Sequence, residues 1–231
     1  MGAVTAERRN AVHVDPPFDH PGYRSTVLRA PSRPLLRLPY GPTELSGPPI
    51  EALLEGRTLA SPTDLTRQHA GEPLGERIVV GGRVLDGDGH PLPGALVEVW
   101  QANASGRYVH GSDQHPAPLD PNFTGAGFCV TDAEGRFRFV TIKPGAYPWK
   151  NHPNAWRPAH LHFSLFGRNF SQRLITQMYF PGDPLLAMDP IYQSIPEPFA
   201  RNQLVARFDI SQTVPEWALG YSFDITLGGR S

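Results

Sequence analysis

Short apolar runs separated by turn residues fill the chain from Glu76 onward and limit the folds that it can adopt. Ala95–Gln101 alternates between two kinds of side chain at a period of two, as a strand with two different faces does. No apolar period of helix length lies between the runs, so the pattern predicts an all-β fold, an antiparallel β-sandwich or barrel, of which we expect the sandwich. The expected strands are 77–86, 95–101, 127–131, 136–142, 159–166, 174–180, 204–210 and 221–227.

Residues 1–75 differ from the rest of the chain in composition and in hydrophobic pattern. They are rich in proline, in stretches such as PPFDHPGY and SGPPIE, and they show no sustained period of 2 or 3.6. We therefore divide the chain into an N-terminal arm, 1–75, and a β-sandwich domain with extended loops, 76–231, in which any site would lie. One short helix is expected near Glu51–Glu55. So long an irregular segment is unusual in a compact domain, and we expect it to cover a partner subunit or to line a site.

Charge and composition exclude several classes of protein. The formal net charge of −1 supplies no positive field for a nucleic-acid backbone or an anionic membrane. Neither a signal peptide nor a stretch near the roughly 20 apolar residues of a membrane span is visible, so a cytoplasmic protein is expected. The single cysteine, Cys129, excludes an internal disulfide and a cysteine-built zinc site, and we expect it to be a small buried hydrophobe.

The sequence AHLHF places two histidines, His160 and His162, two positions apart on an expected strand. Side chains at this spacing share one face, with Cβ atoms about 6–7 Å apart. Two imidazoles so placed can converge on one metal ion with bonds of about 2.0–2.2 Å. The same pair also occurs as two polar residues on a solvated strand face, so the spacing alone leaves both interpretations open.

Two of the seven tyrosines lie where loops leave expected strands. Tyr108 ends the run WQANASGRY, and Tyr147 follows Lys143-Pro144-Gly145-Ala146, in loops of the kind that commonly hold functional groups. Most tyrosines are core or surface residues, so neither position identifies a ligand by itself.

Several motifs occur together in one order: GRVLDGDGHPLPGALVEVWQANASGRY, then TIKPGAYPW, then RPAHLHF. In this order they resemble the intradiol ring-cleaving catechol dioxygenases, most closely over residues 76–195 and more loosely in the arm, through HPGYRSTVLRAP. The resemblance implies one non-haem Fe(III) per chain, with Tyr108, Tyr147, His160 and His162 as its four ligands. Two phenolates and a hydroxide would offset the charge of the hard ferric ion, which prefers anionic oxygen.

The resemblance also implies roles around the metal. Tyr147 is the ligand that leaves with a proton when a catechol binds, so it counts as catalytic. Arg157 matches an arginine beside the substrate ring, and its alternative is a surface ion pair. Gln177 matches a residue near the same ring. Trp149 and Ile191 resemble pocket walls, and Tyr23 resembles an arm residue that binds a substrate carboxylate, its alternative being an ordinary packed tyrosine.

Length and the proline-rich arm resemble the iron-bearing β type of subunit found in the two-subunit branch of this family. That resemblance implies a related α subunit as partner. It also implies cleavage of protocatechuate with O2 to 3-carboxy-cis,cis-muconate, in aromatic catabolism through the β-ketoadipate pathway. The alternatives are an enzyme that acts on catechol or hydroxyquinol, and a transthyretin-like binding module without catalysis, which would leave the four ligands unexplained.

Overall fold

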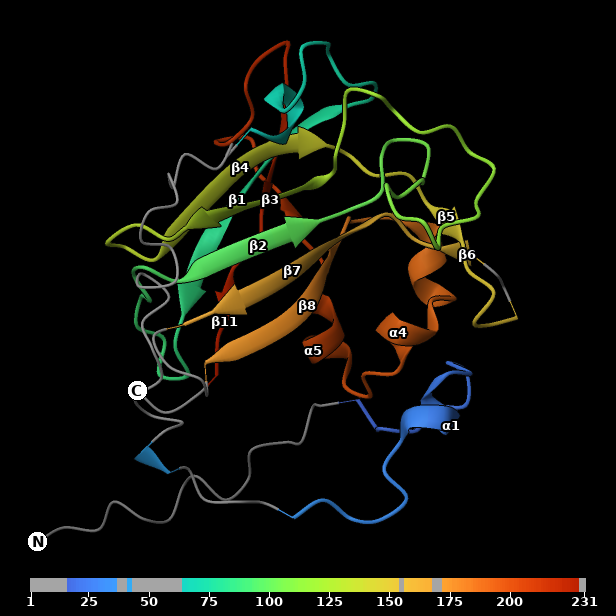
Figure 1. The fold of residues 1–231 in the computed structure, drawn as a ribbon. Helices are drawn as coiled ribbons and strands as arrows, with labels where there is room; N and C mark the ends of the chain where they lie inside the picture. Colours follow the sequence, from blue (N-terminus) through green and yellow to red (C-terminus); the bar gives the residue numbers. More distant parts are fainter. Residues whose placement is uncertain (1–15, 37–40, 43–63, 154–155, 168–171, 229–231) are drawn as a thin grey trace, which may run out of the picture.

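The computed structural model describes residues 16–36, 41–42, 64–153, 156–167 and 172–228. Within these residues most strands belong to two facing sheets (Figure 1). The first sheet is built around β1 (Arg77–Leu85), which pairs along one edge with β4 (Arg136–Ile142). Its other edge pairs with β10 (Leu219–Ser222) and β11 (Ile225–Thr226), and β9 (Arg207–Phe208) lies beyond β10.

The second sheet contains four antiparallel strands. Their order is β3 (Ala126–Val130), β2 (Leu96–Trp100), β7 (His160–Phe166) and β8 (Arg173–Tyr179). Two short strands, β5 (Tyr147–Pro148) and β6 (Trp156–Arg157), pair separately in the loop region beyond one end of this sheet (Figure 1). The second sheet thus places β7 between two neighbours, with its backbone hydrogen bonds satisfied on both sides.

The core lies between the sheets. On β7, Leu161, Phe163 and Leu165 are completely buried and belong to the same cluster as Phe137 and Phe139 of β4. The ring centroid of Phe163 lies 6.0 Å from each of these two phenylalanine rings. Burial of side chains of this size contributes about 1.5–3 kcal/mol each. Because strand side chains alternate, the remaining positions of β7 point away from the core.

The expected all-β sandwich is confirmed, and the expected strands fall within a few residues of those observed. Two details differ. The last predicted strand, 221–227, is split into β10 and β11, because Phe223 donates its N–H to Gly81 and the Asp224 carboxylate accepts from the N–H of Arg83. Both pieces run parallel to β1, since the chain returns to the sheet only after a long excursion.

That excursion contains short helices that the sequence pattern did not predict: η3 (Pro184–Ala187), α4 (Pro190–Gln193) and α5 (Pro198–Asn202). A further 3₁₀ turn, η2 (Leu65–Arg67), precedes β1. Elements of three to five residues are too short to show a helical period. Each helix of the excursion nevertheless begins with proline at its first position after an acidic residue, which is a helix-start signal.

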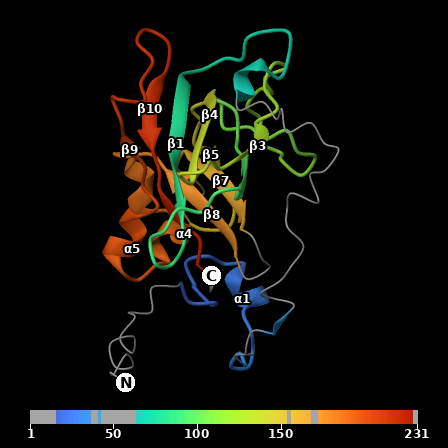
Figure 2. The ribbon, with the colours of Figure 1, turned by 90° about the vertical axis from the view of Figure 1, so that its left-hand side faces the viewer.

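The described part of the arm contains α1 (Thr26–Arg29), which lies below α4 in both views (Figures 1 and 2). It is attached to the body at Asn151, whose backbone oxygen accepts from Arg24 at 3.2 Å and whose side chain accepts from Ser25 at 2.9 Å. The helix expected near 51–55 lies outside the described residues, and the division at residue 75 stays a prediction. In the described part of the chain, no helix has the length and apolar character needed to cross a membrane.

Candidate metal centre

The outer face of β7 carries both histidines of the AHLHF motif. His160 is buried and pairs with Tyr179 of β8, while His162 pairs with Gln177 of β8 and with Trp100 of β2. The imidazole of His162 stacks on the Trp100 indole, with centroids 4.8 Å apart and planes 7° from parallel. The Nδ1–H of His160 donates to the carbonyl of Pro158 at 2.7 Å, which leaves the lone pair of Nε2 for the site.

Tyr108 is presented by the tight loop that follows β2. The side-chain oxygen of Asn103 accepts from the backbone N–H groups of Ser105 and Arg107, at 3.0 and 2.9 Å, and so closes the loop. The backbone N–H of Tyr108 donates to the Asp113 carboxylate at 2.8 Å. The phenol is therefore carried by a backbone that is hydrogen-bonded on both sides.

The loop of Tyr147 is interlocked with the loop of Tyr108. Gly145 donates its N–H to the Asn103 carbonyl at 3.0 Å. Gly106 has φ = +79°, and a β-carbon there would lie 2.2 Å from the carbonyl oxygen of Ala146. Only glycine meets both conditions without strain. The contact brings the two phenol rings together, with centroids 5.4 Å apart in an edge-on arrangement.

The two phenol oxygens and the two imidazole nitrogens meet over the end of the second sheet. The Oη of Tyr108 lies 3.1 Å from the Nε2 of His162, and the Oη of Tyr147 lies 3.3 Å from the Nε2 of His160. Two ligands bound to one ion at about 2.0–2.2 Å, at angles between square and tetrahedral, lie about 2.8–3.6 Å apart. Within each tyrosine–histidine pair, the two donor atoms are therefore spaced as two ligands of a single ion would be.

Burial favours the uncharged form of three of these donors, Tyr108, His160 and His162. Burial, together with the neighbouring Tyr147, raises the pKa of the Tyr108 phenol well above its ordinary value. Burial and the Arg157 cation lower the pKa of His162 to about 4 and hold the pKa of His160 well below its ordinary value. At neutral pH the imidazoles are uncharged, and a bound cation would be needed to remove the proton of the Tyr108 phenol.

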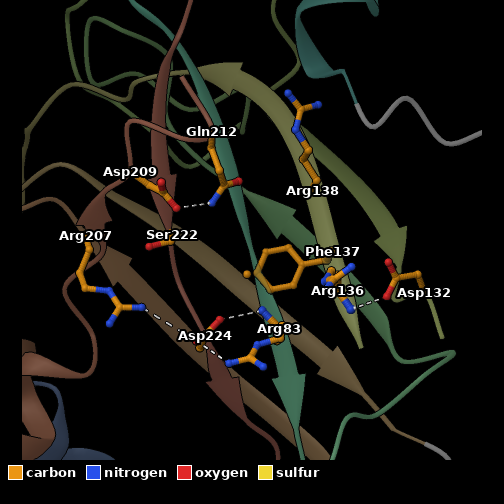
Figure 3. A pocket seen from close by; sticks show the side chains of 11 residues that line it. Arg83, Asp132, Arg136, Phe137, Arg138, Arg207, Asp209, Gln212, Ser222 and Asp224 are labelled. Carbon is orange, nitrogen blue, oxygen red and sulfur yellow. Dashed lines mark hydrogen bonds and ion pairs between the residues drawn. The ribbon is translucent and has the colours of Figure 1, made fainter. Parts of the chain in front are cut away.

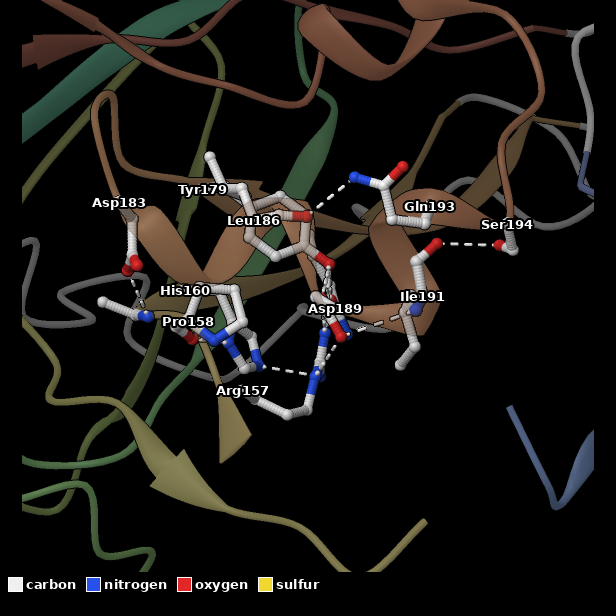
Figure 4. Close-up of polar contacts among 12 residues, drawn as sticks. Arg157, Pro158, His160, Tyr179, Asp183, Leu186, Asp189, Ile191, Gln193 and Ser194 are labelled. Atoms are coloured by element: carbon white, nitrogen blue, oxygen red, sulfur yellow. Dashed lines mark hydrogen bonds and ion pairs between the residues drawn. The ribbon is translucent and has the colours of Figure 1, made fainter. Parts of the chain in front are cut away.

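Arg157, on β6 beside these donors, is buried and is not the surface ion pair that we had considered as an alternative (Figure 4). It forms an ion pair with Asp189, whose side chain is 0% exposed, at 2.8 Å. Its Nη1 lies 3.1 Å from the Nε2 of His160 and 3.5 Å from the Oη of Tyr147. Burial alone would lower the pKa of Arg157, but Tyr179 and Asp189 outweigh burial and raise it, so this group is a permanent cation.

Of the predicted substrate residues, Trp149 and Gln177 contact this cation. The guanidinium carbon of Arg157 lies 5.3 Å from the ring centroid of Trp149, whose indole lies 5.0 Å from the ring of Tyr23 in the arm. Tyr23 and Ile191 line the same cavity, of about 590 Å³, between the arm and α4. The Gln177 amide nitrogen lies 3.4 Å from the Nδ1 of His162. The predicted substrate residues thus lie close to Arg157, to His162 or to one another. Their roles stay predictions.

Sequence reasoning did not single out Asn103 or Asp189, although both support predicted residues. Asp189 is followed by Pro190 at the start of a helix, and this Asp-Pro pair is a readable helix-start signal. No comparable signal identified Asn103, because its function depends on a loop geometry that brings three backbone groups to one side chain.

A second, charged depression of about 500 Å³ lies on the outer face of the first sheet (Figure 3). Arginines and aspartates line it together. The Asp224 carboxylate lies 3.7 Å from Arg83 and 4.0 Å from Arg207, and it also accepts from the backbone of Arg83. Four arginines and three aspartates line it, with no phenol or imidazole among the lining residues, so the depression does not resemble the donor set on β7.

Two family models match the chain. The model described as Dioxygenase covers residues 52–229, and the model described as Protocatechuate 3,4-dioxygenase beta subunit N terminal covers residues 8–40. The first match spans more than half of the sequence and includes all four donor residues. The chain therefore belongs to the dioxygenase family, that of the intradiol ring-cleaving enzymes.

Individual relatives agree with this assignment. The chain is 60% identical over 219 residues to a protocatechuate 3,4-dioxygenase beta chain from Burkholderia cepacia, covering 93% of this chain and 91% of that one. It is 29% identical to a protocatechuate 3,4-dioxygenase alpha chain from Pseudomonas putida, covering 85% of this chain and 96% of that one. The structure matches 3-chlorocatechol 1,2-dioxygenase from Rhodococcus opacus 1CP with a TM-score of 0.54 and 28% identity, covering 72% of this chain and 64% of that one.

The family implies iron, and the donor set fits it chemically. No group of three or more His, Cys, Asp or Glu side chains suited to a metal occurs among the described residues, so an ion on β7 needs the phenols. Phenol oxygens joined to imidazoles suit a hard trivalent ion better than a soft one. The Nε2 lone pair of His160 can bind one partner at a time. An ion bound at this nitrogen would therefore replace its contact with the Nη1 of Arg157.

Proposed function

We propose that this chain is the iron-bearing β subunit of a protocatechuate 3,4-dioxygenase, in the β-ketoadipate pathway of aromatic catabolism. Identity of 60% over 219 residues to a β chain of that name carries the proposal. The meeting of Tyr108, Tyr147, His160 and His162 supports it, because these are the residues that a ferric ion would need. The β chain would hold one non-haem Fe(III).

The reaction converts protocatechuate and O2 to 3-carboxy-cis,cis-muconate. The ring bond between the two hydroxyl-bearing carbons breaks, the O–O bond breaks, and each new carboxylate receives one atom of O2. No external reductant is needed. Bound Fe(III) would supply Lewis acidity and a template for the deprotonated diol.

The chain's own residues manage protons and charge. The substrate must lose two phenolic protons. With the ion bound, Tyr147 would be a phenolate whose Oη accepts one of them, and a solvent-derived hydroxide would accept the other. Arg157, whose Nη1 lies 3.5 Å from that Oη, stabilises negative charge that develops on the substrate ring. Because Arg157 is buried and anchored, it needs little reorganisation during the reaction.

The substrate ring would lie in the space bordered by Trp149, Ile191 and Tyr23. An indole and a branched aliphatic side chain provide flat apolar walls. The Tyr23 hydroxyl is the chain's own candidate for the ring carboxylate. Gln177 would lie near the same ring, and its 3.4 Å contact with the Nδ1 of His162 supports this role.

A related α subunit is the proposed partner, in an α–β hetero-oligomer. Similarity of this chain to both an α chain and a β chain supports a pair of related subunits. The described part of the arm exposes large apolar side chains, such as Leu28 at 91% and Leu36 at 89%, which a partner would cover. Part of the carboxylate pocket would then come from the other chain.

Oxygen uptake tests the proposal directly. Protein co-expressed with its α partner is mixed in turn with protocatechuate, catechol and hydroxyquinol. We expect protocatechuate to give the highest kcat/KM, with one O2 consumed per diol. The similarity to a chlorocatechol enzyme makes a catechol the second candidate, and a preference for catechol or hydroxyquinol would replace the substrate assignment.

Metal content and colour test the site separately. A ferric ion bound by phenolates absorbs visible light by charge transfer, so the pure protein is expected to be red-brown with one iron per β chain. A colourless protein that holds one iron would contradict phenolate ligation. A protein without iron and without oxygen uptake would instead favour a transthyretin-like binding module.

A further inference from the structure

The Asp189 carboxylate lies behind Arg157 and contacts it at two points. Its Oδ1 accepts from the Nε of Arg157 at 3.2 Å, and its Oδ2 accepts from Nη2 at 2.8 Å (Figure 4). Two such contacts fix the plane of a guanidinium as well as its position. Asp189 is completely buried, and the Arg157 side chain is 3% exposed.

The contacts of Arg157 divide its three nitrogens into two groups. Nε and Nη2 contact Asp189, and Nη2 also lies 2.8 Å from the Oε1 of Gln177 and 3.0 Å from the Oη of Tyr179. Nη1 alone faces the donor set, 3.1 Å from the Nε2 of His160. The anchoring of two nitrogens therefore determines where the third one points.

Asp189 is itself held by groups that do not belong to Arg157. It is the N-cap of α4, where its Oδ1 accepts from the backbone N–H of Ile191 at 3.4 Å. Its Oδ2 lies 3.0 Å from the hydroxyl of Tyr179. One carboxylate thus connects the cation to the backbone of the predicted pocket wall, Ile191.

We propose that Asp189 is a positioning residue, which aims Nη1 of Arg157 at the reacting substrate and fixes the Ile191 wall relative to that cation. The inference rests on the proposed function, in which Arg157 stabilises charge on the ring. A flexible guanidinium would have to be ordered in the transition state, whereas an anchored one is already in place.

Asp189→Asn in the iron-loaded α–β complex is the first variant. Asparagine is as good an N-cap as aspartate, so α4 and Ile191 keep their geometry. The variant loses the negative charge of the carboxylate. It also places an amide N–H₂ group, which is a donor, against the N–H donors of Arg157. We expect kcat to fall about 10- to 100-fold, as for other residues that support ligands or catalytic groups from behind. We expect KM to change less than threefold and iron to remain at one per β chain.

A double-mutant cycle separates positioning from a general effect on the site. Arg157→Gln by itself should lower kcat. Adding Asp189→Asn to Arg157→Gln should lower kcat further by less than about threefold, because Asp189 acts through Arg157. Equal losses in both backgrounds would overturn the inference. An Asp189→Asn variant with wild-type kcat would overturn it as well.

Asp183→Asn is the matched control. Asp183 also precedes a proline and caps a short helix, but its carboxylate accepts from the backbone N–H groups of Leu185 and Ala159 instead. We expect its kcat to stay within about threefold of wild type. A loss equal to that of Asp189→Asn would mean that any change in this segment impairs the enzyme, and would overturn the assignment.

A crystal structure of the Asp189→Asn complex gives a readout independent of turnover. We expect the guanidinium of Arg157 to move while the four donor residues stay in place. An unmoved guanidinium would overturn the inference even if turnover fell. If the variant does not fold, Tyr179→Phe replaces it, with an expected loss below tenfold, because both carboxylate contacts to Arg157 remain. A loss as large as that of Arg157→Gln would assign the anchoring to Tyr179.

The two proposals can fail separately. If the wild-type complex cleaves another diol in preference to protocatechuate, the proposed substrate changes. The double-mutant cycle of Arg157→Gln and Asp189→Asn would then be measured with that diol. Absence of turnover with every diol would contradict the proposed function, while the position of Arg157 in the variant crystal would still decide whether Asp189 anchors it.

Discussion

The α-carbon of Gly106 and the carbonyl oxygen of Ala146 are in such close contact that a β-carbon on Gly106 would lie 2.2 Å from that oxygen. The contact joins the loop of Tyr108 to the loop of Tyr147. The separation of the two phenols is therefore determined by backbone contact as well as by the side chains.

Gly106→Ala should disturb both loops. A side chain at φ = +79° costs about 1–2 kcal/mol, and the clash with Ala146 adds to this. We expect the free energy of unfolding to fall by more than about 2 kcal/mol and iron retention to fall with it, measured by denaturation and metal analysis.

Gly89→Ala is the matched control for that variant. Gly89 also has a positive φ, of +86°, but no atom lies within 4 Å of the added β-carbon. It should lose only the conformational part, about 1–2 kcal/mol, and keep its iron. Equal effects of the two substitutions would show that the contact between the loops is unimportant.

His160→Ala and His162→Ala should each lower iron retention while the sandwich stays folded, because both side chains point away from the core. Metal analysis of dialysed protein and circular dichroism measure the two effects. His90→Ala, at an exposed turn position, is the control and should keep its iron. Full iron in both site variants would contradict the ligand assignment.

Arg157→Met should destabilise the protein, because it leaves the buried Asp189 carboxylate without a counter-charge. Loss of one partner of a buried ion pair costs about 3–5 kcal/mol. The double variant Arg157→Met/Asp189→Asn removes both charges and should recover most of that loss. If the double variant were less stable than Arg157→Met, the ion pair would not explain the destabilisation.

Cys129 should be unreactive in the native protein. Burial raises the pKa of its thiol to about 12, whereas an unfolded cysteine titrates near 8.5. The neutral thiol therefore contributes its full stability below about pH 8.5, and this contribution falls as the pH rises toward 12. We expect slow alkylation at pH 8 that becomes fast in denaturant, and a steeper loss of stability above pH 9 than in Cys129→Ala. Rapid alkylation of folded protein would contradict this expectation.

The strands of the core could be predicted because their signal is local. The alternation in Ala95–Gln101 and Ala159–Phe166 follows from one buried and one outer face, and a sequence shows this directly. The parallel pairing of β10 and β11 with β1 could not be predicted, because it depends on where the chain returns after residues 181–218.

The candidate site was predicted through its donor residues and not through their supports. His160 and His162 share a face by spacing alone, and the tyrosines followed from the family resemblance. Asp189 was missed because its role comes from contact with Arg157, 32 positions earlier, and no local pattern records such a contact. Asn103 was missed for the same reason.

The stacking of Trp100 on His162, with planes 7° apart, has a consequence for observing this protein in solution. An indole lying flat against a ligand of a coloured paramagnetic ion loses its fluorescence to that ion. With the proposed ion bound at His162, Trp100 would be an intrinsic optical sensor of occupancy, since its emission would increase when the metal leaves and decrease when it returns. Filling of the site can be followed in real time without an added dye.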